Sequence, residues 1–340
     1  MRRCLAFLVM ALIVAAGCTR TGAAPDHVEK RVQIGVSLDS LQEERWQRDR
    51  DLLVARARAL GADVIVQAAG GDDYLQLAQA ENMLARGVDV LVVVPCSGAA
   101  LAPLVEKAHA AGVKVVAYDR MIPYADVDFY VAFDPEQVGR LQAEYLVRQR
   151  SSGAYVFLGG DPKDHNAQLH RRGVMAVLDP YRQQGSIRLV LDEMLTDRSP
   201  AAVDRLIEQA LAEAGGRIDA VIAPSDTVAG LVIEALQVRG KADGVLVAGQ
   251  DADLAAVRRI LQGTQAMTVY KPIRELAAQT AEAALALARG QEPLATTTVF
   301  NGRKEVPTIL LEPVSVSAGN LLETVVKDGY HREMDLYNLR

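Results

Sequence analysis

The sequence has few of the residues that carry redox or disulfide chemistry. Its 340 residues include three cysteines, and two of these, Cys4 and Cys18, lie within the first twenty positions. Cys96 then has no partner for an intrachain disulfide, so we expect it to act in packing and the fold to depend on its hydrophobic core. The chain is long enough for this, because it can supply two lobes of ordinary size.

Cofactor and catalytic motifs are also missing. The turn after the first apolar run, residues 35–40, contains no Gly-x-Gly-x-x-Gly pattern, and the chain has no phosphate-binding P-loop. Ser225 lacks the context of a nucleophile elbow, and no histidine follows a strand in a way that suggests a catalytic triad. We therefore expect no cofactor, no catalytic residue and no enzymatic activity.

A metal site is not expected either. The nearest candidate ligands are His165, His170, Asp161 and Asp164. Their spacing fits no standard set of metal ligands, so we interpret this group as solvated loop residues.

Long hydrophobic runs are confined to the N-terminus. Arg2 and Arg3 precede an apolar run over residues 5–16, which is shorter than the roughly 20 residues of a membrane-spanning helix. We interpret residues 1–17 as a secretory signal peptide. Residues 15–18 resemble a lipoprotein cleavage box, although Leu is usual in place of Ala15, so we expect a lipid on Cys18 and a flexible leash over residues 18–30. The protein is then expected outside the cytoplasm, in the periplasm or its equivalent, anchored to a membrane.

The chain carries a deficit of positive charge. Its formal net charge of -6 becomes -8 once Arg2 and Arg3 leave with the signal peptide. A mildly acidic surface argues against nucleic acid as a partner. A sugar-responsive repressor is also disfavoured, because no helix-turn-helix precedes the core of the chain.

What the chain does contain is a regular alternation of short β-branched runs and amphipathic stretches. The spacing predicts strands over residues 32–36, 63–67, 88–94, 113–117, 128–132, 154–158, 187–191, 219–222, 245–248, 266–270 and 306–311. It predicts helices over residues 51–60, 74–86, 100–111, 136–150 and 272–289. This is the βαβ pattern of parallel sheets covered by helices, and it restarts midway. The pattern therefore predicts an α/β protein with two doubly wound, Rossmann-like lobes.

Polar residues that follow strand ends are the candidate ligand contacts, because open parallel sheets bind ligands beyond the carboxyl ends of their strands. Carboxylates, amides and guanidinium groups can each bridge two adjacent sugar hydroxyls, and an aromatic ring suits the apolar face of a sugar. Taken singly, such residues are more often solvated or helix caps, as Asp251 could be. The candidates are Arg45, Trp46, Asp119, Arg120, Asp164, Asn166, Asp251 and Lys271.

Several longer segments of the sequence closely resemble segments of the D-xylose-binding periplasmic proteins. They are Glu44–Asp51, Glu81–Met83, Arg86–Val92, Ala117–Ile122, Gly249–Leu254 and Gly263–Ile273, within a similarity that runs from about Arg31 to His331. The resemblance implies the type I periplasmic binding fold, with two lobes joined by three crossings, and delivery of a sugar to an ABC importer.

The resemblance also implies where the lobes begin and end. The crossings would fall near residues 131–135, 268–272 and 303–307. Residues 31–132 with 271–304 would form the N-terminal lobe, and residues 133–270 with 305–340 the C-terminal lobe. The protein would act as a monomer.

By resemblance, all eight candidates contact the sugar, but two positions depart from the family. Arg198, in the loop 196–200, stands at or near the place of a second sugar-stacking Trp, and Ser225 stands where the family has Asn. With Arg198 included, the inferred pocket carries one more cation than carboxylate. We therefore expect xylose or a close pentose as ligand first and an acidic sugar second.

Two partners remain open for such a receptor. Its closed lobes would dock on an ABC permease, or the same closure would present a surface to a membrane histidine kinase. Closure itself requires ligand contacts from both lobes, because a ligand shifts a hinge equilibrium only through its extra affinity for the closed form.

Overall fold

The computed structural model describes residues 31–337. The expected signal peptide, the lipidation site Cys18 and the whole of the expected leash lie outside these residues. Within the described part of the chain, no helix combines the length and the apolar character that crossing a bilayer requires.

Seven strands of the described chain form the first sheet. They are β1 (Gln33–Leu38), β2 (Asp63–Ala68), β3 (Val90–Val93), β4 (Lys114–Tyr118), β5 (Phe129–Phe133), β11 (Thr297–Phe300) and β12 (Glu305–Leu311). Their order is β11-β12-β5-β4-β3-β1-β2, and every pair is parallel except β11 with β12. The central strands are almost fully buried, which explains their continuous runs of apolar residues.

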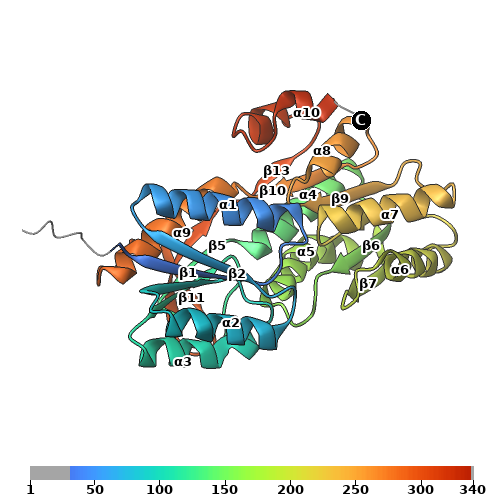
Figure 1. The fold of residues 1–340 in the computed structure, drawn as a ribbon. Coiled ribbons are helices and arrows are strands. Elements are labelled where there is room, and N and C mark those ends of the chain that lie inside the picture. Colours follow the sequence, from blue (N-terminus) through green and yellow to red (C-terminus); the bar gives the residue numbers. More distant parts are fainter. Residues whose placement is uncertain (1–30, 338–340) are drawn as a thin grey trace, which may run out of the picture. The chain divides into compact units, whose positions relative to one another are not determined.

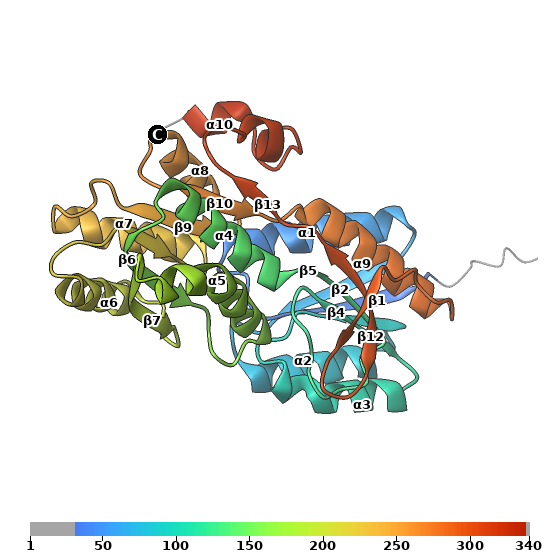
Figure 2. The same ribbon diagram turned by 180° about the vertical axis from the view of Figure 1, so that it is seen from behind.

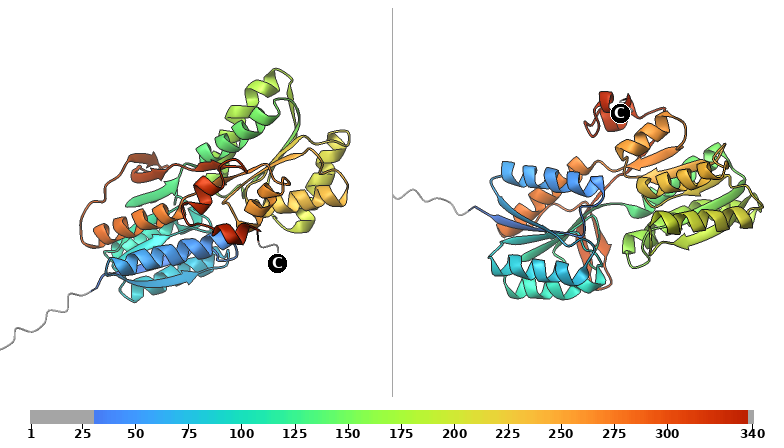
Figure 3. Two further views of the ribbon diagram at one scale, coloured as in Figure 1. Left: turned by 90° about the horizontal axis from the view of Figure 1, so that it is seen from above. Right: turned by 45° about the vertical axis from the view of Figure 1, so that its right-hand side comes forward.

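Within residues 31–337, six strands form the second sheet. They are β6 (Gly153–Gly159), β7 (Ile187–Met194), β8 (Ala220–Ile222), β9 (Leu246–Gln250), β10 (Met267–Tyr270) and β13 (Val314–Val316). Their order is β13-β10-β9-β8-β6-β7, and only β13 runs antiparallel to its neighbour. The two sheets are separate bodies in Figure 3.

Helices cover both faces of each sheet (Figures 1 and 2). On the first sheet, α1 (Glu44–Ala59) and α9 (Ile273–Ala288) pack on one face, and α2 (Asp73–Ala85), the short η1 (Ala99–Leu101) and α3 (Ala102–Ala110) on the other. On the second sheet, α4 (Pro135–Gln149) and α5 (His165–Gln183) face α6 (Pro200–Glu213), α7 (Asp226–Val238) and α8 (Leu254–Leu261) across the strands. The prediction of two doubly wound α/β lobes is confirmed.

The described chain passes between the two sheets three times. The first crossing lies at Asp134, whose side chain caps α4 by accepting from the backbone N–H of Glu136 at 2.9 Å. The second lies at residues 271–272, between β10 and α9, and the third at residues 312–313, between β12 and β13.

The expected position of the third crossing was wrong. It was expected near residues 303–307, with residues 305–340 in the C-terminal lobe. Instead β12 pairs in parallel with β5, from Thr308 opposite Tyr130 to Leu311 opposite Phe133. The apolar run of β12 is thus buried beside β5 in the N-terminal lobe, and only the chain after it reaches the C-terminal lobe.

The last part of the described chain, residues 317–337, lies beside both lobes. It contains η2 (Leu322–Val326) and α10 (Glu333–Tyr337). Its apolar side chains join the same buried cluster as residues of α1, α8 and α9, and α10 contacts α8. We call residues 317–337 the C-terminal segment.

Candidate functional site

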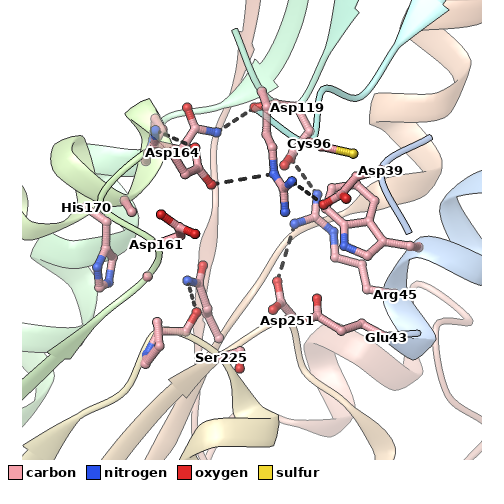
Figure 4. Close-up of a pocket in the computed structure, with 18 of the residues that line it drawn as sticks. Asp39, Glu43, Arg45, Cys96, Asp119, Asp161, Asp164, His170, Ser225 and Asp251 are labelled. Carbon is pink, nitrogen blue, oxygen red and sulfur yellow. Dashed lines mark hydrogen bonds and ion pairs between the residues drawn. The ribbon is translucent and has the colours of Figure 1, made fainter. Parts of the chain in front are cut away.

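All ten residues expected to contact the ligand line one cavity of about 360 Å³. Arg45 and Trp46 lie in the first turn of α1, Asp119 and Arg120 follow β4, and Asn166 lies in the first turn of α5. Asp164 and Ser225 precede α5 and α7, Arg198 lies between β7 and α6, and Asp251 and Lys271 follow β9 and β10. The carboxyl ends of the strands of both sheets therefore meet at this cavity, as parallel sheets require. Figure 4 shows labelled carboxylates and Arg45 facing the same space from both lobes.

Arg45 is the buried centre of the charge network. It is 4% exposed and pairs with Asp119, with Asp49 at 3.2 Å and with Asp251 at 3.4 Å. Burial alone would lower its pKa, but the three carboxylates outweigh burial and raise the pKa well above its ordinary value. Arg45 is thus a fixed cation that orients carboxylates from both lobes.

The carboxylates around Arg45 differ in their protonation behaviour. Burial would raise the pKa of Asp119, but Arg45 and Lys271 outweigh it and lower that pKa, so Asp119 stays ionised. Burial raises the pKa of Asp49 to about 6, although Arg45 opposes this. Asp49 accepts a hydrogen bond from the Tyr118 hydroxyl and lies behind Arg45. Asp49 therefore stabilises Arg45 on the side away from the cavity, whereas the Asp119 carboxylate faces the cavity.

Arg120 joins the two lobes. Its Nη1 lies 2.6 Å from Asp39 and 3.2 Å from the carbonyl oxygen of Pro95, and its Nε lies 3.6 Å from Asp164 of the C-terminal lobe. Its guanidinium also lies 5.2 Å from the centroid of the Trp46 ring, and that of Arg45 lies 4.6 Å from it. Two cations thus hold the single tryptophan of the chain in place.

Asn166 makes a second polar bridge between the lobes. Its side-chain amide donates to the backbone carbonyl of Asp119 at 2.7 Å. Its Oδ1 atom is buried and has no hydrogen-bond partner. Because a buried acceptor without a donor is costly, this oxygen is suited to a hydroxyl of a ligand.

Arg198 and Ser225, where the chain departs from the resembling family, play different parts. Arg198 is largely exposed and pairs with Glu43 of the N-terminal lobe at 3.3 Å, at the edge of the cavity. Ser225 is buried, and its Oγ accepts from the N–H of Val228 at 3.3 Å as the N-cap of α7. Both line the cavity, and contact of either with a ligand remains a prediction.

The cavity is more acidic than the sequence suggested. Beyond the ten expected residues, the charged side chains that line it are Asp39, Glu43, Asp73, Asp161 and Lys163. The lining therefore holds seven carboxylates and five cations in all. The expected excess of positive charge in the pocket was therefore wrong. Asp39 and Asp161 lie in segments after strand ends that the sequence marks as polar, but nothing in one sequence separates them from solvated loop residues.

His170 is a buried residue rather than a solvated one, which corrects the sequence interpretation. It is 4% exposed in α5, lines the cavity, and its ring stacks on Phe157 at 5.8 Å between centroids. The amide nitrogen of Gln142 donates to the carbonyls of Ala223 and Gly249, so its Oε1 accepts from Nε2 of His170. Burial lowers the pKa of His170 to about 3, so the ring is neutral.

The chemistry available in the cavity is that of binding. Within residues 31–337, no group of three or more His, Cys, Asp or Glu side chains could hold a metal ion. The Cys96 thiol lines the cavity, but burial and the nearby Asp39 raise its pKa, so it stays protonated and unreactive. What remains is a ring of fixed charges and amides that can donate to and accept from adjacent hydroxyls.

Comparisons with known proteins find periplasmic and solute-binding proteins that bind sugars. Residues 34–292 match the family described as periplasmic binding protein domain. The D-xylose-binding periplasmic protein of Escherichia coli (strain K12) is 49% identical over 307 residues, which cover 90% of this chain and 93% of that protein. The protein of the same name from Haemophilus influenzae is 44% identical over 328 residues, or 96% and 98% of the two chains. A solved carbohydrate transporter solute-binding protein from Chloroflexus aurantiacus, in complex with D-glucose, is 32% identical with a TM-score of 0.84, over 91% of this chain and 99% of that chain.

Proposed function

Because this chain belongs to the family of periplasmic binding proteins, we propose that it is a receptor for a neutral monosaccharide, D-xylose or a close aldose, which it delivers to an ABC importer. The observation that carries the proposal is the convergence of all ten expected residues on one cavity, from the strand ends of both lobes. A ligand held there gains contacts from both lobes only when they are together, which is how such a ligand drives closure. The protein performs no chemistry on the sugar.

Charge supports a neutral sugar over an acidic one. A uronate would bring a further negative charge to a cavity lined by seven carboxylates and five cations. Every cation except Lys163 is already within 4.0 Å of a carboxylate. A uronate would therefore have to displace existing ion pairs, whereas neutral hydroxyls can share them.

Calorimetric titration tests this proposal. A purified chain without residues 1–18 would be titrated with D-xylose, D-glucose and D-glucuronate. We expect saturable binding of D-xylose at one site per chain, weaker binding of D-glucose, and the weakest binding of D-glucuronate. Tighter binding of the uronate than of both neutral sugars would overturn the preference for a neutral ligand. If none of the three sugars releases heat, the proposal that the chain is a sugar receptor is wrong.

The choice of membrane partner needs a separate test. In cells that lack the protein, uptake of labelled xylose is expected to fall and to return when the gene is restored. Normal uptake together with the loss of a xylose-induced transcriptional response would favour a sensory kinase as the partner instead.

We also propose that Cys18 carries a lipid anchor. The support is the signal-like run before it and the small residues at positions 15–17. A Cys18→Ser variant is then expected to leave the membrane fraction and to lose incorporation of labelled palmitate. A variant that stays in the membrane fraction would contradict the proposal.

A further inference from the structure

The backbone at Asp251 and Ala252 is strained. Their φ angles are 97° and 55°, in the left-handed region that residues other than glycine rarely adopt. Asp251 carries a carboxylate of the site, which lies 3.4 Å from Nη1 of Arg45 and 3.0 Å from Nζ of Lys271. A strained backbone persists only where its surroundings hold it, so the contacts of this turn decide where the carboxylate points.

Two side chains of the C-terminal segment hold the carbonyl groups of this turn. The Tyr330 hydroxyl donates to the carbonyl oxygen of Asp251 at 3.3 Å, and Nε2 of His331 lies 2.7 Å from the carbonyl oxygen of Ala252. Both side chains are buried, at 8% and 4% exposure. The N–H groups of the turn are held from β10, by the carbonyl of Val269 and the hydroxyl of Thr268. All four backbone polar groups of the turn are therefore bonded, two of them through the C-terminal segment.

The same two side chains contact the N-terminal lobe. Arg48 of α1, one turn after Arg45, donates to the carbonyl oxygen of Tyr330, and its guanidinium lies 4.5 Å from the centroid of the Tyr330 ring. Its Nη2 lies 3.4 Å from Nδ1 of His331. The helix that carries Arg45 and the turn that carries Asp251 are thus tied to one pair of residues.

These contacts fix the protonation state of His331. A backbone carbonyl only accepts, so Nε2 must carry the hydrogen that it donates to Ala252. A guanidinium only donates, so Nδ1 must be the bare acceptor that faces Arg48. Both bonds require the neutral ring, and a second proton on Nδ1 would point at a positive charge.

We infer that Tyr330 and His331 are positioning residues that hold the Asp251 carboxylate in its binding orientation and couple it to α1 through Arg48. This inference rests on the proposed function, because it concerns the affinity of the same site. The two residues touch no ligand themselves. They act by fixing a strained turn that would otherwise relax and carry Asp251 away from Arg45 and Lys271.

The neutral state of His331 makes this arrangement sensitive to acid. Burial lowers the pKa of His331, and Arg48 adds to this, while Glu44 of α1, Asp335 of α10 and the Ala252 carbonyl oppose it. The ring is therefore neutral above its ordinary pKa of 6.5 and gains a proton only as the pH falls below it. Sugar affinity is expected to fall with His331 protonation in that acidic range, and to show no pH dependence from this residue above it.

Three variants test the inference by calorimetric titration with D-xylose at pH 7.5 and at lower pH. Gln can donate through an amide where His331 donates through Nε2, and it does not titrate. We expect His331→Gln to bind as the wild type does at pH 7.5 and to lose less affinity in acid. We expect His331→Ala and Tyr330→Phe to bind about fivefold more weakly at pH 7.5, the effect of one neutral hydrogen bond.

Tyr270→Phe is the matched control. It removes a hydroxyl that donates to Asp328 of the same C-terminal segment but touches neither Asp251 nor Ala252, so its affinity should not change. Burial raises the pKa of Asp49 to about 6 and that of Asp253 to about 7. Both carboxyls titrate in every variant, so their effect on affinity cancels when the variants are compared with the wild type.

The outcomes separate the two claims. The positioning role is wrong if the wild type binds D-xylose and both His331→Ala and Tyr330→Phe bind it as tightly as the wild type does. It is also wrong if the affinity of His331→Gln falls in acid as much as that of the wild type. If the wild type binds no sugar, the proposed function fails first. Should His331→Ala not fold, the acid profile of His331→Gln and the affinity of Tyr330→Phe still decide.

Discussion

Asp251 is the residue where most of the local evidence meets. It has a positive φ, lies between two cations, and receives its backbone support from the C-terminal segment. Its carboxylate is the ion-pair partner that Arg45 and Lys271 share. Removal of that charge should therefore affect ligand binding more than it affects folding.

The first prediction concerns this charge. Asp251→Asn keeps the size of the side chain but removes the charge, so two cations lose a partner and the ligand loses a charge-assisted acceptor. We expect D-xylose affinity to fall about 10- to 100-fold, the range of hydrogen bonds to charged groups. Calorimetric titration measures this change, and circular dichroism checks that the fold is intact. Unchanged affinity in a folded variant would exclude Asp251 from the site.

Arg198 gives the contrasting prediction. Its ion pair with Glu43 lies at the edge of the cavity, where the two side chains are 46% and 33% exposed, and exposed pairs contribute little. We therefore expect Arg198→Ala to weaken D-xylose binding by less than about fivefold, and added salt to reduce even that difference. A loss as large as that of Asp251→Asn would instead make Arg198 a direct ligand contact.

The sequence could predict these residues only in part. Polar residues at strand ends pointed to Asp119, Asp251 and Lys271, because topology alone brings such ends together. The burial of His170 could not be predicted, since it depends on Gln142 reaching from another helix. The sign of the pocket charge also escaped prediction, because it depends on which loop carboxylates face inward.

At the scale of elements, the crossing of α4 and α5 sets the position of Asp164 and Asn166. Two glycines allow the helices to approach closely. A Cβ atom on Gly173 would lie 1.9 Å from the carbonyl oxygen of Glu136, and one on Gly139 would lie 2.1 Å from that of His170. No side chain fits at either point, so the crossing depends on both glycines.

Gly173→Ala tests this crossing. The added methyl group must push α5 away from α4, which should lower the free energy of unfolding by about 1–3 kcal/mol. It should also weaken D-xylose binding, because the N-terminus of α5 moves with the helix. Chemical denaturation and calorimetric titration measure the two effects.

Gly230→Ala in α7 is the matched control for this substitution. Its nearest neighbour is Nη1 of Arg259 at 3.1 Å, which has to shift by only a few tenths of an ångström. We expect its stability to stay within about 1 kcal/mol of the wild type. Equal stability of the two variants would show that the helix crossing tolerates a side chain.

The sequence predicted the buried strands well, but it gave no helix ranges for α5 to α8 and missed two edge strands. Buried parallel strands such as β3 and β4 are recognisable in the sequence by their unbroken apolar runs. The edge strands β11 and β13 are short and lack such runs, so they were not predicted. The third crossing was misplaced for a related reason, because a strand such as β12 can join either sheet until its partner is known.

At the scale of the molecule, three crossings and four polar bridges join the described lobes. The bridges are those of Arg45 with Asp251, Arg120 with Asp164, Asn166 with the Asp119 carbonyl, and Arg198 with Glu43. All eight residues of these bridges also line the cavity. The groups proposed to hold the ligand are therefore also the groups that hold the lobes together, and this is how the proposal couples binding to closure.

Small-angle scattering with and without saturating D-xylose tests this coupling most directly. We expect the radius of gyration of the wild type to decrease when the sugar is added, and that of Asp251→Asn to show the same decrease only at about 10- to 100-fold higher concentrations of D-xylose. Calorimetric binding of D-xylose with no change in the scattering profile would contradict an account in which both lobes grip the ligand.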